Sequence, residues 1–111
     1  MPWWYFDQPE KGREKKMAVR VLMKREYSED KAEALRELTD KMRVLAMDQS
    51  GYVSGETLKR IDRPGASLVI SKWKSIEAWQ NWFNTAEREN MQKKIDELLQ
   101  METQYEIYDY D

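Results

Sequence analysis

The apolar residues of this chain change between strand-like and helix-like spacing in a regular order, and that order restricts the folds open to it. Alternation of apolar and polar residues, typical of a half-buried strand, predicts strands over residues 17–25, 52–60, 67–73 and 103–110. Apolar residues three and four positions apart predict two amphipathic helices over residues 28–50 and 75–99, the second with a break at Asn84-Thr85. Ser28 and Ser75 are placed to cap these helices. The predicted order of elements is βαββαβ.

This order predicts an α+β fold of the ferredoxin-like type. Right-handed crossovers give a four-stranded antiparallel sheet with both helices on one face. The other face is left uncovered, and the pattern leaves open which of several residues point towards it: Arg20, Lys24, Val69, Ser71, Trp73 and either Tyr105 or Tyr108. Because a sheet face that carries aromatic side chains favours burial, we expect two copies to pack face to face as a homodimer, forming a dimeric α/β barrel.

The length of 111 residues allows one domain. We assign this domain to residues 17–111 and interpret residues 1–16 as an N-terminal extension. Four consecutive aromatic residues, Trp3 to Phe6, and a charged run distinguish the extension from the rest of the chain. We expect it either to be disordered or to dock through its aromatic side chains on an apolar surface.

The charge balance excludes several classes of partner. The chain has 19 basic and 21 acidic residues, and this balance does not produce the broad positive field of a nucleic-acid binder. RNA-recognition modules share the βαββαβ order, but the strand over 67–73 lacks their basic-glycine-aromatic pattern. No apolar run has the length of a membrane span. We therefore expect no nucleic acid and no membrane as partners, and a cytoplasmic location.

The sequence contains neither histidine nor cysteine, which narrows the possible chemistry. Thiolate catalysis and the common zinc, iron–sulfur and copper ligand sets are excluded, and we expect no metal site. A base that acts near neutral pH must then be a carboxylate, a lysine or a tyrosine with a shifted pKa. The candidates are Glu56, Lys24 and Tyr108, although Glu56 and Lys24 are also explained as solvated edge charges and Tyr108 as dimer packing.

Tryptophans are concentrated between residues 73 and 82. Trp79 and Trp82 lie three positions apart, on one face of the predicted helix, and Trp73 ends a central strand. We predict that these three residues and Arg20 line a pocket, although each tryptophan is also explained as core. Arg20 and Lys24 share a strand face, where they could hold an anionic substrate group or pair with Glu106 or Asp109 across strands.

Three segments resemble a known family: Gly51-Tyr-Val-Ser-Gly-Glu-Thr-Leu58, the strand end Trp73-Lys-Ser, and Ile76-Glu-Ala-Trp-Gln-Asn-Trp-Phe-Asn-Thr85. They are similar to the antibiotic-biosynthesis-monooxygenase-like domain of the dimeric α/β-barrel superfamily, over about residues 17–110. The resemblance implies a cofactor-independent monooxygenase that acts on a small aromatic compound, a quinol or a phenol. It adds Trp73 to the catalytic candidates, as the residue that begins the matching segment.

Two other functions are compatible with the same resemblance. One is a non-catalytic module that binds a small ligand or assembles with a partner, since no obvious base is present. The other is the haem-degrading branch of the superfamily, whose pattern Trp73 and Trp82-Phe83 fit. In that branch a histidine ligates iron, and the corresponding position here is Gln92. The branch's strand-one asparagine is also replaced, near Met23 or Lys24.

Overall fold

The fold is seen in a computed structural model, which describes residues 18–110. The extension predicted over residues 1–16, including Trp3 to Phe6, lies outside the described residues. The elements are β1 (Val19–Glu26), η1 (Glu29–Lys31), α3 (Ala32–Met47), β2 (Tyr52–Lys59), β3 (Ala66–Trp73), α4 (Ile76–Phe83), α5 (Ala86–Leu99) and β4 (Gln104–Asp109).

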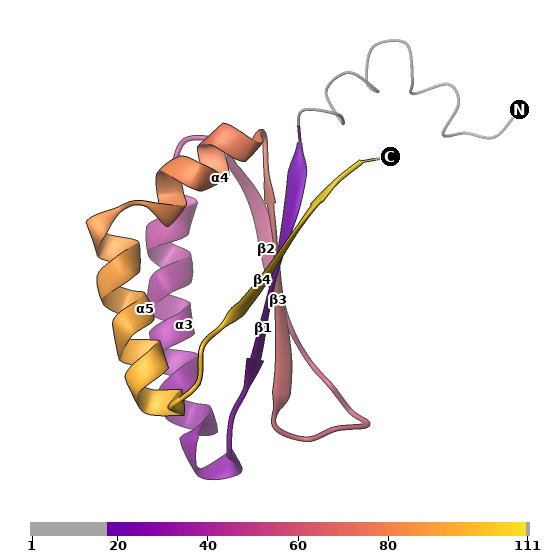
Figure 1. The fold of residues 1–111 in the computed structure, drawn as a ribbon, viewed down its shortest axis with the longest axis vertical. Coiled ribbons are helices and arrows are strands. Elements are labelled where there is room, and N and C mark those ends of the chain that lie inside the picture. Colours follow the sequence, from indigo (N-terminus) through magenta and orange to yellow (C-terminus); the bar gives the residue numbers. More distant parts are fainter. Residues whose placement is uncertain (1–17, 111) are drawn as a thin grey trace, which may run out of the picture.

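The strands form one antiparallel sheet in the order β2-β3-β1-β4, with the helices packed on one side of it (Figure 1). The predicted ferredoxin-like α+β fold is confirmed. Among the described residues, no helix is both long enough and apolar enough to cross a membrane.

Polar caps divide the second helical region into two helices. Ser75 accepts a hydrogen bond from the backbone N–H of Ala78, and Thr85 accepts one from that of Arg88. The start of the first helix differs from the prediction, because the Ser28 side chain makes no capping bond. Instead the backbone N–H of Lys31 bonds to the Ser28 carbonyl, which produces a short 3-10 turn before α3 begins at Ala32.

Strand register decides which residues face the helices. Val19 is opposite Trp73, and Met23 is opposite both Val69 and Tyr105, so these residues share the helix side of the sheet. The uncovered side of β1 carries Arg20, Leu22 and Lys24. Of the residues that sequence could not place, Val69, Ser71, Trp73 and Tyr105 thus face the helices, while Arg20, Lys24 and Tyr108 lie on the other face.

The hydrophobic core lies between the sheet and the helices. Its most buried side chains are Val21, Trp73 and Ile95, contributed by β1, β3 and α5. The Trp73 ring stacks against that of Trp82 with centroids 6.4 Å apart. This contact fixes the position of α4 against the sheet, and so determines the geometry of the site described below.

Gly51 allows α4 to pack closely against the start of β2. Its φ of +88° is a conformation that non-glycine residues rarely adopt, and an added Cβ would lie 2.5 Å from the Cβ of Ala78. We expect Gly51→Ala to lower the free energy of unfolding by about 2–4 kcal/mol, since backbone strain and overpacking add. Urea denaturation checks this, with the exposed Ser50→Ala as the control. A loss below about 1 kcal/mol would show that α4 does not depend on this contact.

Candidate functional site

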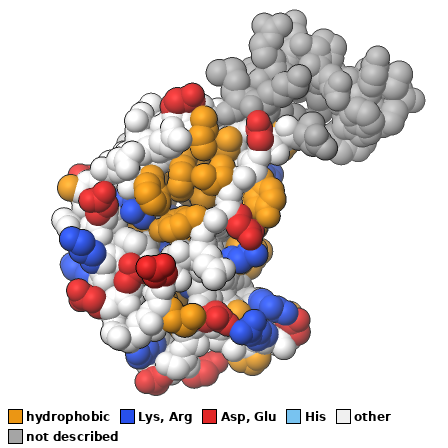
Figure 2. All heavy atoms as spheres, viewed as in Figure 1, with side chains coloured by type: hydrophobic (Ala, Val, Ile, Leu, Met, Phe, Trp, Pro, Cys, Tyr) orange, Lys and Arg blue, Asp and Glu red, His pale blue; other side chains and the backbone are white. Residues whose placement is uncertain are grey.

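A cavity lies between the helix side of the sheet and the helices. Its interior volume is about 50 Å³, room for a few water molecules, and the total empty space including its opening to solvent is about 570 Å³. Its aromatic walls come from β2, β3, α4 and β4: Tyr52, Trp73, Trp79, Trp82, Phe83 and Tyr105. Figure 2 shows hydrophobic side chains gathered on the surface between α4 and β4.

The aromatic walls are held by ring contacts. Tyr52 meets the Trp73 ring edge to face at 5.3 Å, and the Trp73 indole N–H donates to the Ser71 hydroxyl at 3.1 Å. Phe83 contacts Trp79 at 4.9 Å and Tyr105 at 5.5 Å. These contacts fix the orientation of the rings that line the cavity. Because the interior itself holds only a few water molecules, an aromatic molecule would occupy the larger space that includes the opening to solvent.

A polar network forms one part of the cavity wall. Arg88 on α5 donates through Nε to the Phe83 carbonyl at 2.6 Å and through Nη1 to the Tyr105 hydroxyl at 3.1 Å. That hydroxyl in turn donates to Gln92 Oε1 at 3.0 Å. Arg25 on β1 contacts the same oxygen at 3.5 Å and donates through Nε to Thr103 at 3.0 Å. Arg88, Tyr105 and Gln92 thus link α5 to β4 and Arg25.

The polar network contains two buried positive charges, the guanidinium groups of Arg25 and Arg88. Arg25 and Arg88 are only 4% and 7% exposed, yet the ion pairs of residues 18–110 involve neither of them. Burial lowers the pKa of the Arg25 guanidinium, which the nearby Tyr105 and Asp96 partly offset. The Arg88 guanidinium also lies 3.9 Å from the centre of the Phe83 ring. Two buried cations without a carboxylate partner favour an anion in the cavity.

The structure brings together three of the four residues expected to line a pocket. Trp73, Trp79 and Trp82 all line the cavity, but Arg20 does not. Arg20 lies on the uncovered face of the sheet, where its Nε donates to the Tyr110 hydroxyl at 3.2 Å. It was expected beside the tryptophans because alternation alone did not tell which face the helices cover.

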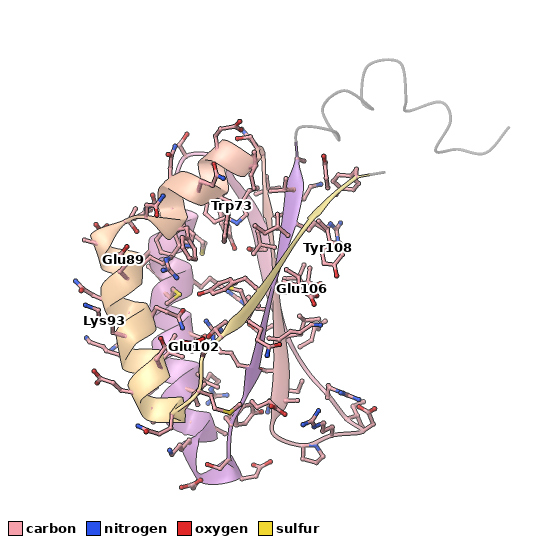
Figure 3. All side chains as sticks on the ribbon, in the orientation of Figure 1. Trp73, Glu89, Lys93, Glu102, Glu106 and Tyr108 are labelled. Carbon is pink, nitrogen blue, oxygen red and sulfur yellow. The ribbon has the colours of Figure 1, made fainter. Side chains whose placement is uncertain are left out.

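The three candidate bases lie on the uncovered face as well. Lys24 pairs with Glu106 at 3.0 Å, and the Tyr108 hydroxyl donates to the same carboxylate at 3.0 Å. This hydrogen bond raises the pKa of Tyr108, while the bonds from Lys24 and Tyr108 lower the pKa of Glu106. Glu56 is opposite Ile70 on β3 and is exposed. Figure 3 shows Tyr108 and Glu106 projecting away from the helices, whereas Trp73 lies between sheet and helices.

Sequence reasoning missed Arg25 and Arg88. Both had a usable signal, because each occupies an apolar stripe: Arg25 continues the inward alternation of Val21 and Met23, and Arg88 precedes Met91 by one helical turn. A charged residue on an inward stripe predicts either a buried partner or a site. Within residues 18–110 the partners of both arginines are neutral groups, and neither arginine forms an ion pair.

Gln92 is the residue that the resemblance to the haem-degrading branch places at the iron-ligand position. Its Oε1 accepts from Tyr105 and Arg25, and its Nε2 donates to Asp96 at 2.8 Å and Thr103 at 2.9 Å. The amide is therefore fully engaged with protein groups. In the part of the chain that the structure describes, no three acidic side chains cluster as metal ligands.

Comparison with known proteins gives a family and a set of similar structures. Residues 18–94 match the model of a family described as antibiotic biosynthesis monooxygenase. No curated protein has a significantly similar sequence. A conserved protein from Methanosarcina mazei Go1 aligns with a TM-score of 0.82 and 16% identity over 90% of this chain and 99% of its own.

Two further structures carry descriptions of activity. SnoaB from Streptomyces nogalater, described as a cofactor-independent oxygenase, aligns with a TM-score of 0.74 and 13% identity, over 86% of this chain and 94% of its own. A putative antibiotic biosynthesis monooxygenase from Nitrosomonas europaea aligns with a TM-score of 0.77 and 16% identity, over 86% and 91%. At these identities the likeness shows the fold.

Proposed function

The chain belongs to the antibiotic biosynthesis monooxygenase family, and from this premise we propose that it oxidises a small phenolic or quinol compound without a cofactor. The observation that carries the proposal is the cavity itself, which combines aromatic walls with two buried arginines that form no ion pair within residues 18–110. The description of SnoaB as a cofactor-independent oxygenase supports the reaction type.

The reaction we propose uses the electrons of the substrate. In an anthrone-type compound, a ring CH2 group reacts with O2 and becomes a carbonyl, while the second oxygen atom leaves in water with the two hydrogens. Reaction with O2 begins from the substrate anion. The aromatic walls would orient the ring and exclude water, and the positive charge of Arg88 would stabilise the anion.

The chain has no histidine, and none of the described residues that line the cavity is a carboxylate. Among residues 18–110, the ionisable residues that line it are Tyr52, Tyr105 and the arginines at positions 25, 43 and 88. We therefore propose that the cations lower the pKa of the substrate's own hydroxyl, so that its proton passes to water at the solvent opening of the cavity before the ring is enclosed. Lys24, Glu56 and Tyr108 have no direct role in this account, because they lie on the opposite face of the sheet.

Oxygen uptake tests the proposal. The purified chain, incubated aerobically with an anthrone or a hydroquinone and a metal chelator, is expected to consume oxygen faster than the compound does alone. Thr39→Trp places a large side chain at a half-buried position of the cavity wall, and we expect it to slow uptake at least about tenfold by excluding the substrate. Glu37→Trp, on the exposed side of the same helix, is the matched control.

A second candidate function is ligand binding without catalysis. It is favoured by the lining of the cavity, where the described residues include no carboxylate or histidine. Binding of the aromatic compound without oxygen uptake would establish this function in place of the oxygenase. Titration with haem tests the third alternative, and we expect no Soret shift because Gln92 is engaged.

We also propose that the uncovered sheet face packs against a second copy of the chain. Its centre carries Leu22, Leu68 and Ile70, and the side chains of Leu58 and Tyr108 remain half exposed around them. Sedimentation at micromolar concentration is expected to give twice the chain mass of 13.4 kDa. Ile70→Glu should give the monomer because it places a charge at the interface, whereas Lys94→Glu on exposed α5 should not. A monomeric wild type would contradict the dimer.

A further inference from the structure

We propose that the ligand of the cavity is an aromatic carboxylate, whose carboxylate group binds between Arg25 and Arg88. The inference rests on the proposed function only in treating this ligand as the substrate, and it deepens that function by naming the substrate class. It is argued from the hydrogen bonds of the two guanidinium groups.

Each guanidinium group has one terminal nitrogen that makes no hydrogen bond to residues 18–110. The protein partners of Arg88 use Nε and Nη1, and those of Arg25 use Nε and Nη2. Within residues 18–110, no fully buried side-chain nitrogen or oxygen lacks a partner. Nη2 of Arg88 and Nη1 of Arg25 are therefore not fully enclosed by protein, and both residues line the cavity, although Arg25 also borders two neighbouring pockets. We assign these two nitrogens as the donors to the ligand.

The charge of the pair favours more than a phenolate. A phenolate oxygen near Arg88 and Tyr105 would balance one cation and leave Arg25 with only the attraction of Asp96, with which it forms no ion pair within residues 18–110. In the same range, Tyr105 and Gln92 join Arg25 to Arg88, and both are neutral hydrogen-bonding groups. Burial is the main cause that lowers the pKa of Arg25, Tyr105 and Asp96 oppose it, and Arg88 adds a smaller lowering. A carboxylate has two oxygens and can accept from both arginines at once.

A purely structural role explains the network less well. Arg25 and Arg88 do connect β1, α5 and β4, but neutral amides could make the same hydrogen bonds. Within residues 18–110 the two buried charges form no ion pair, and the attraction of Asp96 offsets only part of the effect of burial on Arg25, so their burial costs free energy that neutral side chains would avoid. A bound anion recovers that cost, and this is the property expected of a binding site.

The test compares 1-naphthoate with 1-naphthamide, which share a ring system and differ in charge. Binding to the wild-type chain is measured without oxygen, by quenching of tryptophan fluorescence and by calorimetry. We expect 1-naphthoate to bind at least about tenfold more tightly, as charge-assisted hydrogen bonds to two arginines predict. Equal affinities, or no detectable binding of either compound, would overturn the proposal.

Substitutions of single arginines show which side chain causes the tighter binding of 1-naphthoate. Arg25→Gln keeps a hydrogen-bonding side chain but removes a charge, and it should reduce the preference for 1-naphthoate while binding of 1-naphthamide stays within about threefold. Arg20→Gln, on the other sheet face, should leave the preference unchanged. A preference that survives in Arg25→Gln would overturn the assignment, and the wild-type comparison decides the ligand class if that variant does not fold.

Oxygen uptake with a neutral quinol separates this inference from the proposed function. Uptake without a preference for the carboxylate would leave the oxygenase standing and refute the ligand class. Tighter binding of 1-naphthoate without oxygen uptake would support the ligand class and refute the oxygenase.

Discussion

Replacing Trp73 with alanine is expected to lower the free energy of unfolding by about 3–5 kcal/mol, one of the largest single effects available in this chain. The Trp73 side chain is 1% exposed, contacts the rings of Tyr52 and Trp82, and donates to Ser71. Its removal would open a cavity at the centre of the sheet. Urea denaturation at a fixed protein concentration measures the effect without a contribution from changes in association.

Two controls accompany this measurement. Trp73→Phe keeps an aromatic ring and should lose less stability than the alanine variant, although the Ser71 hydroxyl then loses its indole partner. Val53→Ala, at a half-exposed position on β2, should change stability by no more than about 0.5 kcal/mol. A loss below about 1.5 kcal/mol for Trp73→Ala would mean that the ring contacts do not hold the core together.

Replacing Arg88 with glutamine is expected to slow oxidation of a quinol by about 10²–10³-fold, the usual effect of removing one group that stabilises a developing anion. Arg88 is buried against the cavity and contacts both Phe83 and Tyr105. Oxygen uptake measures the rate. Arg88→Lys keeps the charge and should retain more activity than the glutamine variant, but less than wild type because the two-pronged geometry is lost.

Loss of folding must be separated from loss of chemistry in this experiment. Circular dichroism gives the folded fraction of each variant, to which the rate is normalised. Lys93→Gln is the matched control, because Lys93 lies on the same helix and points away from the cavity (Figure 3). An Arg88→Gln rate within about threefold of wild type would refute a role for the guanidinium in stabilising the anion.

The fold could be predicted from the sequence because its local signals agree with one another. The strand predicted over 52–60 is Tyr52–Lys59, and the one predicted over 67–73 is Ala66–Trp73. Thr85 supplies a cap for α5 at the predicted break, so the broken helix was visible as well. The beginning of α3 differs most from its predicted position, since Ser28 resembles an N-cap but makes no capping bond.

The site could be predicted only in part, because alternation groups residues by face without saying which face is covered. On β3, Leu68 and Ile70 are apolar on one side and Val69 and Trp73 on the other, so the strand gives no preference. The tryptophans of α4 were predicted to line a pocket, since a helix with one broad apolar face must present it to the sheet.

The candidate bases lie apart from the tryptophans for a related reason. The candidate bases were Lys24, Glu56 and Tyr108. In the alternation of their strands, these residues point to the uncovered face of the sheet, whereas Trp73 points to the helices. The same alternation places Arg25 on the helix side of the sheet, and the sequence analysis did not consider it as a site residue. An ionisable residue that falls on the buried, apolar side of a strand or helix is a better candidate for the site than one on the exposed side.

A ligand-bound crystal structure tests the central claim most directly. Crystals soaked without oxygen in an unreactive aromatic carboxylate such as 1-naphthoate should show a ring against Trp73 and a carboxylate within hydrogen-bonding distance of Arg25 and Arg88. Density for the ligand on the opposite sheet face, beside Arg20 and Lys24, with the cavity empty, would contradict the claim that the space between sheet and helices is the binding site.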